Sequence, residues 1–264
     1  MKIYTVDAFT DCPFKGNPAA VAIVDEIPDD GTCQKIAAEI NLSETAFVEG
    51  LGENHFHIRW FTPKVEVKLC GHATLASAHI LHQEKLVSSQ EIRFESLSGE
   101  LKVYISPSDY TLDFPLSKTE EAIEPSSMAS ISHFGKIIQV SRVEDDVIIE
   151  LPSEEQIRNY FPCIDELEKI DCRGVIITSK GTGYYDFISR FFAPRVGVNE
   201  DPVTGSAHSK LAYYWQKRLN KSDFKAYQAS ERGGEIGVSI MGDRVNLSGK
   251  AVTIFSGEWQ VSLP

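Results

Sequence analysis

Two stretches of the chain decide its fold because they repeat one pattern: Ile58–Val67 reads IRWFTPKVEV and Ser189–Val198 reads SRFFAPRVGV. Both run arginine, aromatic residue, phenylalanine, small residue, proline, basic residue, valine, any residue, valine. Internal repeats set the architecture of a chain, so they are examined first. One match of this length can arise by chance, and the segments that follow each copy provide the test.

The segments that follow the two copies also match each other. Each copy is followed by a glycine that opens a predicted helix, over 71–82 in the first case and 205–219 in the second. Each helix is followed by a predicted strand, a glycine-containing turn and another strand, over 94–103 and 227–238. Three matches in the same order indicate a duplication and predict two halves with the same topology.

The remaining pattern is mostly strand. The stretch 55–61 is strand-like, 32–40 has apolar residues at helical spacing, and 154–160 is a predicted helix with a Ser153/Gln156 capping box. The two glycine-initiated helices carry small and apolar residues on nearly every face, so each should be buried. We therefore predict an α+β fold of two pseudo-symmetric halves, each a curved, barrel-like β-sheet around a central helix.

The boundary between the halves is expected in the acidic, serine-rich stretch 117–132, which reads SKTEEAIEPSSMASIS. The predicted domains are therefore residues 1–117 and residues 118–264. The first carries the candidate base described below, and the second carries the other copy of the repeat.

Composition limits the function classes. The 264 residues carry a net charge of -12, and a chain this acidic repels nucleic-acid backbones. No apolar run is long enough to cross a membrane, and the N-terminus does not resemble a signal peptide, so a cytoplasmic location is expected. The five scattered cysteines form no CxxC pair or zinc-type cluster and are expected to be free thiols: Cys12, Cys33, Cys70, Cys163 and Cys172.

The two helix starts offer a binding function. A helix N-terminus presents unpaired backbone N–H groups and a partial positive charge, which suits a carboxylate or phosphate. Gly71 and Gly205 would let a ligand approach the backbone closely. Matched glycines in two copies favour an anionic small-molecule substrate, although each glycine could also serve only to make a tight strand-to-helix turn.

Acid–base candidates lie around these turns. Glu44 sits between a helix and an apolar strand, where partial desolvation should raise its pKa. His72 lies on the first turn of its helix, where the positive helix end should favour the neutral imidazole. Asp201 precedes the second helix and Ser206 lies at its start. Read alone, each also has an ordinary explanation as a loop, cap or half-buried polar residue.

Several phrases of the sequence resemble the phenazine-biosynthesis PhzF-like family, which has the diaminopimelate epimerase superfold. They run from the N-terminal region to the second helix: Asp7–Phe9 (DAF), Gly16–Val21 (GNPAAV), Asn41–Phe47 (NLSETAF), Leu69–Thr74 (LCGHAT) and Glu200–His208 (EDPVTGSAH). Together the phrases are specific, and the resemblance covers essentially the whole chain.

The resemblance implies two like halves with the active site between them, no metal, no organic cofactor, and a homodimer. In this family a glutamate moves a proton on a small carboxylate-bearing ring, and that glutamate falls on Glu44. The supporting catalytic residues fall on His72, Asp201 and Ser206. Expected substrate-binding residues surround the two helix starts: Cys70, Gly71, Ala73, Thr204 and Gly205.

The resemblance also bears on a rival mechanism. Diaminopimelate epimerases and proline racemases share the superfold but use two opposed cysteines. Cys70 occupies the first cysteine position, whereas Thr204 occupies the second and cannot act as a thiolate. The sequence therefore predicts a cofactor-independent, PhzF-like isomerase. An epimerase or racemase of an amino or hydroxy acid, and a non-catalytic protein that binds a small carboxylate, remain as alternatives.

Overall fold

The computed structural model describes residues 1–118, 120–125 and 129–260. The chain forms two compact units: unit 1 comprises Met1–Phe114 and Ser248–Pro264, and unit 2 comprises Pro115–Leu247. Whereas the expected division assigned 118–264 to one half, the C-terminal residues here return to unit 1. The reason is β18 (Ala251–Glu258), which pairs antiparallel along the whole of β1 (Lys2–Ala8).

Unit 1 is a single run of paired strands. In spatial order, β18 pairs with β1, β1 with β2, β2 with β3, β3 with β4, β4 with β6, β6 with β7 and β7 with β8; the pairs β2–β3 and β4–β6 are parallel. Its remaining elements are β2 (Asn17–Val24), α1 (Asp30–Ile40), β3 (Glu44–Gly52), β4 (His55–Phe61), β5 (Glu66–Val67), α2 (Gly71–Gln83), β6 (Glu91–Ser96), β7 (Gly99–Ile105) and β8 (Tyr110–Pro115).

Unit 2 repeats this order. Here β10 pairs with β11, β11 with β12, β12 with β13, β13 with β15 and β15 with β16; the pairs β11–β12 and β13–β15 are parallel. Its elements are β9 (Glu121–Ile123), η2 (Ala129–Phe134), β10 (Gln139–Val143), β11 (Asp146–Glu150), α3 (Glu154–Arg158), α4 (Ile164–Glu168), β12 (Gly174–Lys180), β13 (Phe187–Ala193), η3 (Pro194–Val196), β14 (Val198–Asp201), α5 (Gly205–Leu219), β15 (Asp223–Gln228), β16 (Gly234–Met241) and β17 (Arg244–Gly249).

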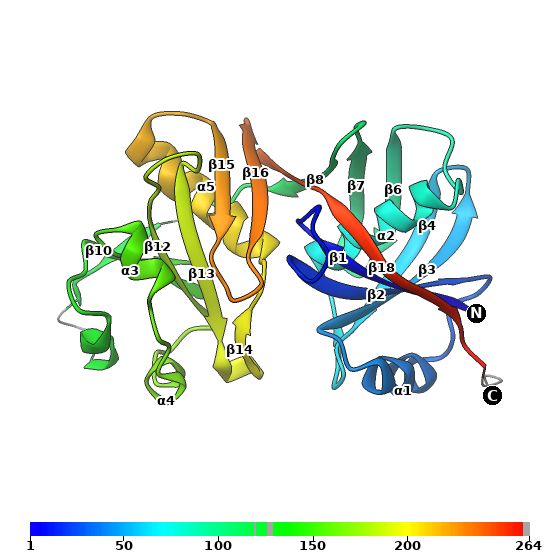
Figure 1. Ribbon diagram of the computed structural model, residues 1–264, viewed down its shortest axis with the longest axis horizontal. Helices are drawn as coiled ribbons and strands as arrows, with labels where there is room; N and C mark the ends of the chain where they lie inside the picture. The colour runs from blue at the N-terminus through cyan, green and yellow to red at the C-terminus, as the bar shows by residue number, and fades with distance from the viewer. Residues whose placement is uncertain (119, 126–128, 261–264) are drawn as a thin grey trace. The chain divides into compact units, whose positions relative to one another are not determined.

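The two central helices occupy equivalent places in the two units. Within unit 1, α2 packs against β1, β2, β3, β7 and β18, and within unit 2, α5 packs against β16 (Figure 1). Both helices are largely buried. In each unit, the two parallel strand pairs are joined by connections that contain helices, as parallel pairing requires. The predicted α+β fold of two like halves around central helices is therefore confirmed.

The expected linker is partly structured. Residues 119 and 126–128 of the stretch 117–132 lie outside the described residues. In the rest, β9 pairs antiparallel with β10, and η2 begins at Ala129. The acidic composition of this stretch hides β9, since Glu121 and Ala122 are exposed and Ile123 is the one residue of the strand that packs against the apolar core of unit 2.

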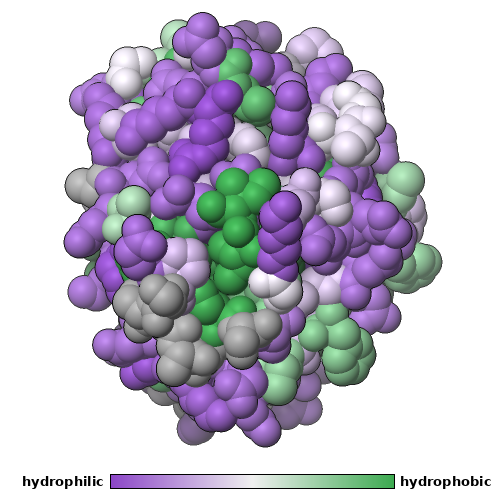
Figure 2. Space-filling model, turned by 90° about the vertical axis from the view of Figure 1, so that its left-hand side faces the viewer, coloured by the Kyte–Doolittle hydropathy of each residue, from purple (hydrophilic) through white to green (hydrophobic). Residues whose placement is uncertain are grey.

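The surface is mostly hydrophilic. Figure 2 shows one face of unit 2, where an apolar strip interrupts a predominantly hydrophilic surface. Among the residues of unit 2, Ile138 and Phe161 are large apolar residues with exposed fractions of 54% and 91%. Among the residues the structure describes, no helix combines the length and apolar character needed to cross a membrane.

Candidate active site

The start of β3 holds a carboxylate in a largely buried position. Helix α1 ends at Asn41, whose left-handed backbone (φ 55°) turns the chain toward β3. Glu44 is the first residue of β3 and pairs with Ala19 of the parallel strand β2. Its side chain is only 18% exposed. A short turn after a helix thus places an acidic group at the start of a strand whose next four residues are buried.

The start of α2 faces this carboxylate. Cys70 is the N-cap residue, and its side chain makes no capping hydrogen bond. The first N–H groups of the helix therefore lack the usual side-chain acceptor at the N-cap. His72, one residue into the helix, is 6% exposed, and Cys70 is 7% exposed. Both side chains are effectively sealed from water.

Glu44, His72 and Cys70 form one cluster. The Oε2 atom of Glu44 lies 3.1 Å from Nε2 of His72. The Cys70 sulfur lies 3.5 Å from Nδ1 and 4.0 Å from Nε2 of the same ring. Oε2 of Glu44 is buried, and no described donor is aligned with it. The contact with His72 is therefore an ion-pair distance rather than a well-aligned hydrogen bond, and the Oε2 lone pairs remain usable.

Two further polar residues orient the histidine. The Nδ2 atom of Asn17 lies 3.2 Å from Nδ1 of His72, and Asn17 is completely buried in β2. The direction of this contact depends on the protonation of the ring, and a charged ring donates from both of its nitrogens. The hydroxyl of Ser43 donates to the carbonyl of Pro18 at 2.8 Å and lies 3.5 Å from Nε2. Asn17 and Ser43 thus help set the ring position.

The electrostatics differ from expectation. Burial opposes ionisation of Glu44, but the positive charge and hydrogen bonding of His72 outweigh it, so the Glu44 pKa is lowered. Burial likewise opposes a charged His72, but its interactions with the Cys70 side chain and the Glu44 carboxylate raise its pKa well above 6.5. The predicted raised pKa of Glu44 and neutral imidazole of His72 are both wrong. The contacts among Glu44, His72 and Cys70, which are not visible in the sequence, together outweigh the effects of desolvation and of the positive end of the helix on both pKa values.

The Cys70 thiol is harder to ionise than an ordinary cysteine. Complete burial, reinforced by the nearby Glu44 carboxylate, raises the pKa of Cys70. A buried thiol with a raised pKa is a poor nucleophile. The nearby His72 lowers the thiol pKa but does not outweigh burial and the Glu44 carboxylate, so the thiolate form of Cys70 is disfavoured.

In unit 2, Asp201 and Thr204 lie together at the start of α5. The Thr204 hydroxyl donates a short hydrogen bond to the Asp201 carboxylate. The Thr204 N–H donates to the side-chain carbonyl of Gln228 at 2.9 Å, and the Gln228 amide donates to the Asp201 carbonyl oxygen at 2.6 Å. Gln228 is fully buried. This network fixes the turn that leads into α5.

Ser206 has a different neighbourhood. It is exposed, and its hydroxyl oxygen accepts a 3.4 Å hydrogen bond from the guanidinium of Arg173. Arg173 in turn pairs with Asp145 and Asp146, and the buried Lys210 donates to the same two carboxylates at 2.7 Å each. Glu144 also lies 3.5 Å from the Lys210 ammonium, so a cluster of three acidic and two basic groups lies next to Ser206 at the start of α5.

The structure thus groups the sequence-predicted residues within each unit. Unit 1 brings Glu44, Cys70, Gly71, His72 and Ala73 to one end of α2, and unit 2 brings Asp201, Thr204, Gly205 and Ser206 to the start of α5. Sequence reasoning missed Asn17, Ser43, Gln228 and Arg173. A buried asparagine at the start of the apolar stretch NPAAVAIV was the one usable signal among them.

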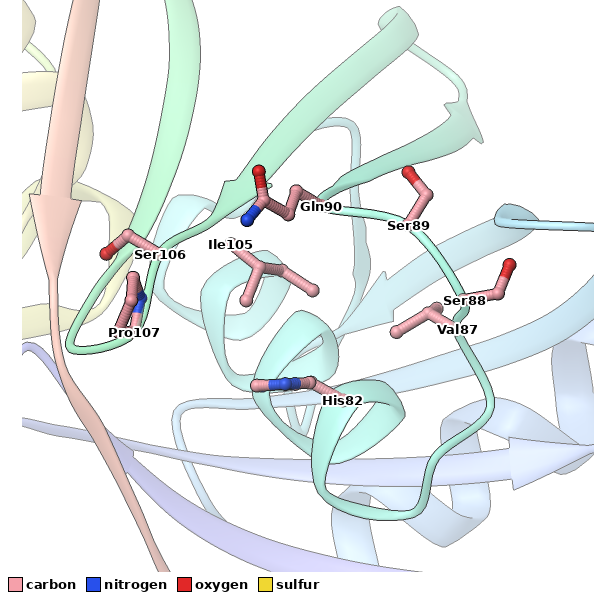
Figure 3. Close-up of a pocket in the computed structure, with 8 residues that line it drawn as sticks. All are labelled: His82, Val87, Ser88, Ser89, Gln90, Ile105, Ser106 and Pro107. Atoms are coloured by element: carbon pink, nitrogen blue, oxygen red, sulfur yellow. The ribbon is translucent and has the colours of Figure 1, made fainter.

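The pocket in Figure 3 lies elsewhere in unit 1. It has a volume of about 300 Å³ and is lined by His82, Val87, Ser88, Ser89, Gln90, Ile105, Ser106 and Pro107. His82 stands near the C-terminal end of α2, ten residues from His72, or roughly 15 Å along the helix. Its lining contains no carboxylate. This pocket is therefore separate from the Glu44 cluster.

Comparisons with known proteins agree with this fold. The family model for phenazine biosynthesis-like proteins (PhzC-PhzF) matches residues 6–257. An uncharacterized isomerase of Halalkalibacterium halodurans is 48% identical over 260 residues, covering 97% of both chains. An uncharacterized isomerase of Pseudomonas aeruginosa is 44% identical, covering 97% of this chain and 98% of that protein.

Solved structures give the same result. A PhzF-family phenazine biosynthesis protein from Enterococcus faecalis superposes with a TM-score of 0.92 at 40% identity, covering 98% of this chain and 99% of that one. A hydroxyproline epimerase from Agrobacterium vitis, with a TM-score of 0.59 at 12% identity, shares the fold over 97% of this chain and 91% of its own. The chain belongs to the PhzC/PhzF family of phenazine biosynthesis-like proteins, and like its named relatives it is an isomerase.

Proposed function

We propose that this isomerase moves a proton on a small carboxylate-bearing substrate without a cofactor, with Glu44 as the base that removes the proton and the acid that returns it. The single observation that supports this most is the 3.1 Å contact between buried Glu44 and His72 beside the start of α2. A carboxylate whose pKa is lowered is ionised near neutral pH, so it is ready to accept a proton.

In this proposal the proton balance is simple. The Glu44 carboxylate takes a proton from a substrate carbon, and the electron pair left on that carbon delocalises into an adjacent double bond. The protonated Glu44 then returns the proton to another carbon of the same system. The His72 imidazole, held by Asn17 and Ser43, orients Glu44 and balances its charge in both steps.

The start of α2 is the proposed site for the substrate carboxylate. Its first N–H groups have no side-chain cap, and such groups favour anions. Local packing does not require a glycine at position 71, since a Cβ there would meet Phe114 only at an ordinary 3.5 Å. A ligand that approaches the backbone explains the glycine better, and the amide of Ala73 lies in the same turn.

The positions in unit 2 that match the cluster argue against a two-base epimerase. Glu44 opens the parallel ladder β2–β3, and the residue that opens the matching ladder β11–β12 is Gly174. Cys70 and His72 correspond to Thr204 and Ser206 at the start of α5. A racemase that inverts a centre needs a second base on the opposite face, and none of these counterparts provides one. Asp201, the acid nearby, is hydrogen-bonded to Thr204.

The test is proton exchange into small carboxylates in heavy water, followed by mass spectrometry and NMR across a panel of unsaturated and chiral acids. We expect deuterium incorporation with double-bond migration, and a loss of about 10²-fold or more for Glu44→Gln. Glu49→Gln is the matched control, because Glu49 lies on the same strand and also faces a histidine, His57, at 4.0 Å.

The outcomes separate the alternatives. Unchanged exchange in Glu44→Gln would exclude Glu44 as the base. Inversion of a chiral acid without double-bond migration would favour the epimerase, and tight binding of a carboxylate without any exchange would favour a non-catalytic binding protein. Roles for Asp201 and Ser206 in the reaction, a homodimeric state and a cytoplasmic location stay predictions. Light scattering of the purified protein tests the dimer.

A further inference from the structure

The cluster at the start of α2 has a second chemical property besides proton transfer. Glu44, Cys70 and His72 each offer one ligand atom, a carboxylate oxygen, a sulfur and a ring nitrogen, and these atoms all lie within 4.8 Å of one another. No zinc-type spacing is visible in the sequence, because Glu44 approaches Cys70 and His72 only through the pairing of β3 with β2 and the packing of α2 on both strands.

The two donor-atom separations from His72 are close to those of a tetrahedral metal site. With zinc bond lengths of about 2.0–2.3 Å, ligand atoms at tetrahedral angles lie about 3.3 Å apart for nitrogen and oxygen and about 3.6 Å apart for nitrogen and sulfur. The observed separations from Nε2 of His72 are 3.1 Å to Glu44 and 4.0 Å to Cys70. Each differs from the ideal value by a few tenths of an ångström, which side-chain rotation can absorb.

A second observation points to a ligand at the same place. Oε2 of Glu44 is a buried atom with no aligned donor among the described residues. A buried carboxylate oxygen that accepts no aligned hydrogen bond carries a desolvation cost, which coordination to a cation would offset. The Glu44 side chain is 18% exposed, so an ion can reach the cluster from that side.

We propose that Glu44, Cys70 and His72 bind a divalent cation of intermediate softness, Zn²⁺, and that the bound ion blocks proton transfer. On binding, the Cys70 thiol and the charged His72 ring each release one proton to solvent, which frees the sulfur and the Nε2 lone pair for the ion, while Glu44 supplies a carboxylate oxygen. A fourth position remains for water. A sulfur, nitrogen and oxygen set of this kind selects zinc or cobalt over magnesium and calcium.

The first experiment measures binding in the absence of any substrate. Titration calorimetry with ZnCl₂ and absorption spectroscopy with CoCl₂ are carried out on untagged protein in which the exposed Cys12 and Cys163 are serine. We expect one Zn²⁺ per chain, and for Co²⁺ a sulfur-to-metal charge-transfer band in the near ultraviolet. MgCl₂ should give neither signal. Absence of stoichiometric Zn²⁺ binding would overturn the proposal.

The variants identify the ligands. Cys70→Ala should weaken Zn²⁺ binding by at least about tenfold and remove the charge-transfer band. Cys33→Ala is the matched control, because Cys33 is also buried but packs in a separate apolar cluster with α1. It should retain both signals. A charge-transfer band that persists in Cys70→Ala, or is lost equally in both variants, would refute the assignment of the sulfur ligand.

Glu44→Gln provides an independent variant should Cys70→Ala not fold. It should retain the charge-transfer band of the Cys70 sulfur but bind Zn²⁺ at least about tenfold more weakly; unchanged affinity would remove Glu44 from the site. Inhibition by Zn²⁺ rests on the proposed function, since it requires Glu44 to be the base. Binding without inhibition would leave the metal site intact and count against Glu44 as the base instead.

Discussion

At the level of single residues, the neighbours of Glu44 decide its behaviour. Burial alone would raise its pKa, and the lowered value depends on the charge of His72. His72 depends in turn on Glu44 and Cys70. Each group therefore stabilises the charged form of the other. In such a pair, removing one member exposes the desolvation cost of the other.

His72→Asn tests this dependence. Without the imidazole, burial becomes the dominant influence, so the Glu44 pKa should rise above its ordinary value of 4.5 instead of lying below it. The acidic limb of the pH–rate profile, which reports protonation of the base, should move to higher pH with it. A ¹³C NMR titration of glutamate-labelled protein measures the pKa directly and needs no substrate.

The sign of the stability effect follows from the same shifts. A lowered Glu44 pKa adds stability that is present above pH 4.5 and is lost as the pH falls through the folded-state pKa. A raised His72 pKa adds stability that is present below pH 6.5 and is lost as the pH rises through its folded-state pKa. Both contributions are therefore complete between pH 4.5 and 6.5.

The control for His72→Asn is His57→Asn, next to the more exposed Glu49, and this variant should leave the pKa of Glu44 unchanged. A Glu44 pKa that stays low in His72→Asn would contradict the account.

At the level of elements, the sequence predicted those whose signals are local. The predicted strand 55–61 and the predicted helix 205–219 have the same bounds as β4 and α5. The predicted helix 154–160, by contrast, ends at Arg158 as α3. The Tyr160 carbonyl accepts a hydrogen bond from Arg190 of β13, and its ring stacks on Phe134. These long-range contacts draw Tyr160 out of the helix, and a helical pattern cannot reveal them.

Ser153 provides a prediction at this level. It caps α3 by accepting a 3.3 Å hydrogen bond from the Gln156 N–H, so the serine half of the predicted capping box is present. Ser153→Ala should lower the free energy of unfolding of unit 2 by about 1 kcal/mol, measured by urea denaturation. Ser153→Asp retains a cap and should lose much less. Equal losses in the two variants would mean that the cap contributes little.

The candidate site was predictable in part, because some of its signals are local in the sequence and others depend on long-range contacts. Glu44, His72 and Cys70 stand in short motifs that resemble a family, so sequence could nominate them. Their ionisation could not be predicted, because it depends on a 3.1 Å contact between Glu44 and His72, which lie far apart in the sequence. Asn17 and Ser43 were missed as site residues because their roles come from contacts with the same imidazole.

At the level of the whole molecule, unit 1 is discontinuous and unit 2 is not. Strand β18 comes from the end of the chain but pairs with β1 at its beginning. Strand β1 is bonded on its other side to β2, which begins at Asn17. The sheet that carries Asn17 and Glu44 therefore depends on residues that follow all of unit 2 in the sequence.

Truncation after Leu247 tests this dependence. Removing residues 248–264 leaves one side of β1 without its antiparallel partner, so amide-exchange protection in β1 and β2 should fall about tenfold or more. Protection in β12 and β13 of unit 2 should persist, because their pairing lies within 115–247. Hydrogen-exchange mass spectrometry measures both, and a peptide of residues 248–260 should restore protection in β1. Equal protection in truncated and full-length protein would contradict the prediction.

The pairing of β18 with β1 also determines the order in which the two units can complete their sheets during synthesis. Domains generally fold during synthesis from the N-terminus onward. Here the residues of unit 2 leave the ribosome as one contiguous segment before β18 has been translated, whereas β1 must wait for it. The half that was synthesised first thus completes its sheet last, and the nascent chain carries an unfinished strand edge until β18 has been translated.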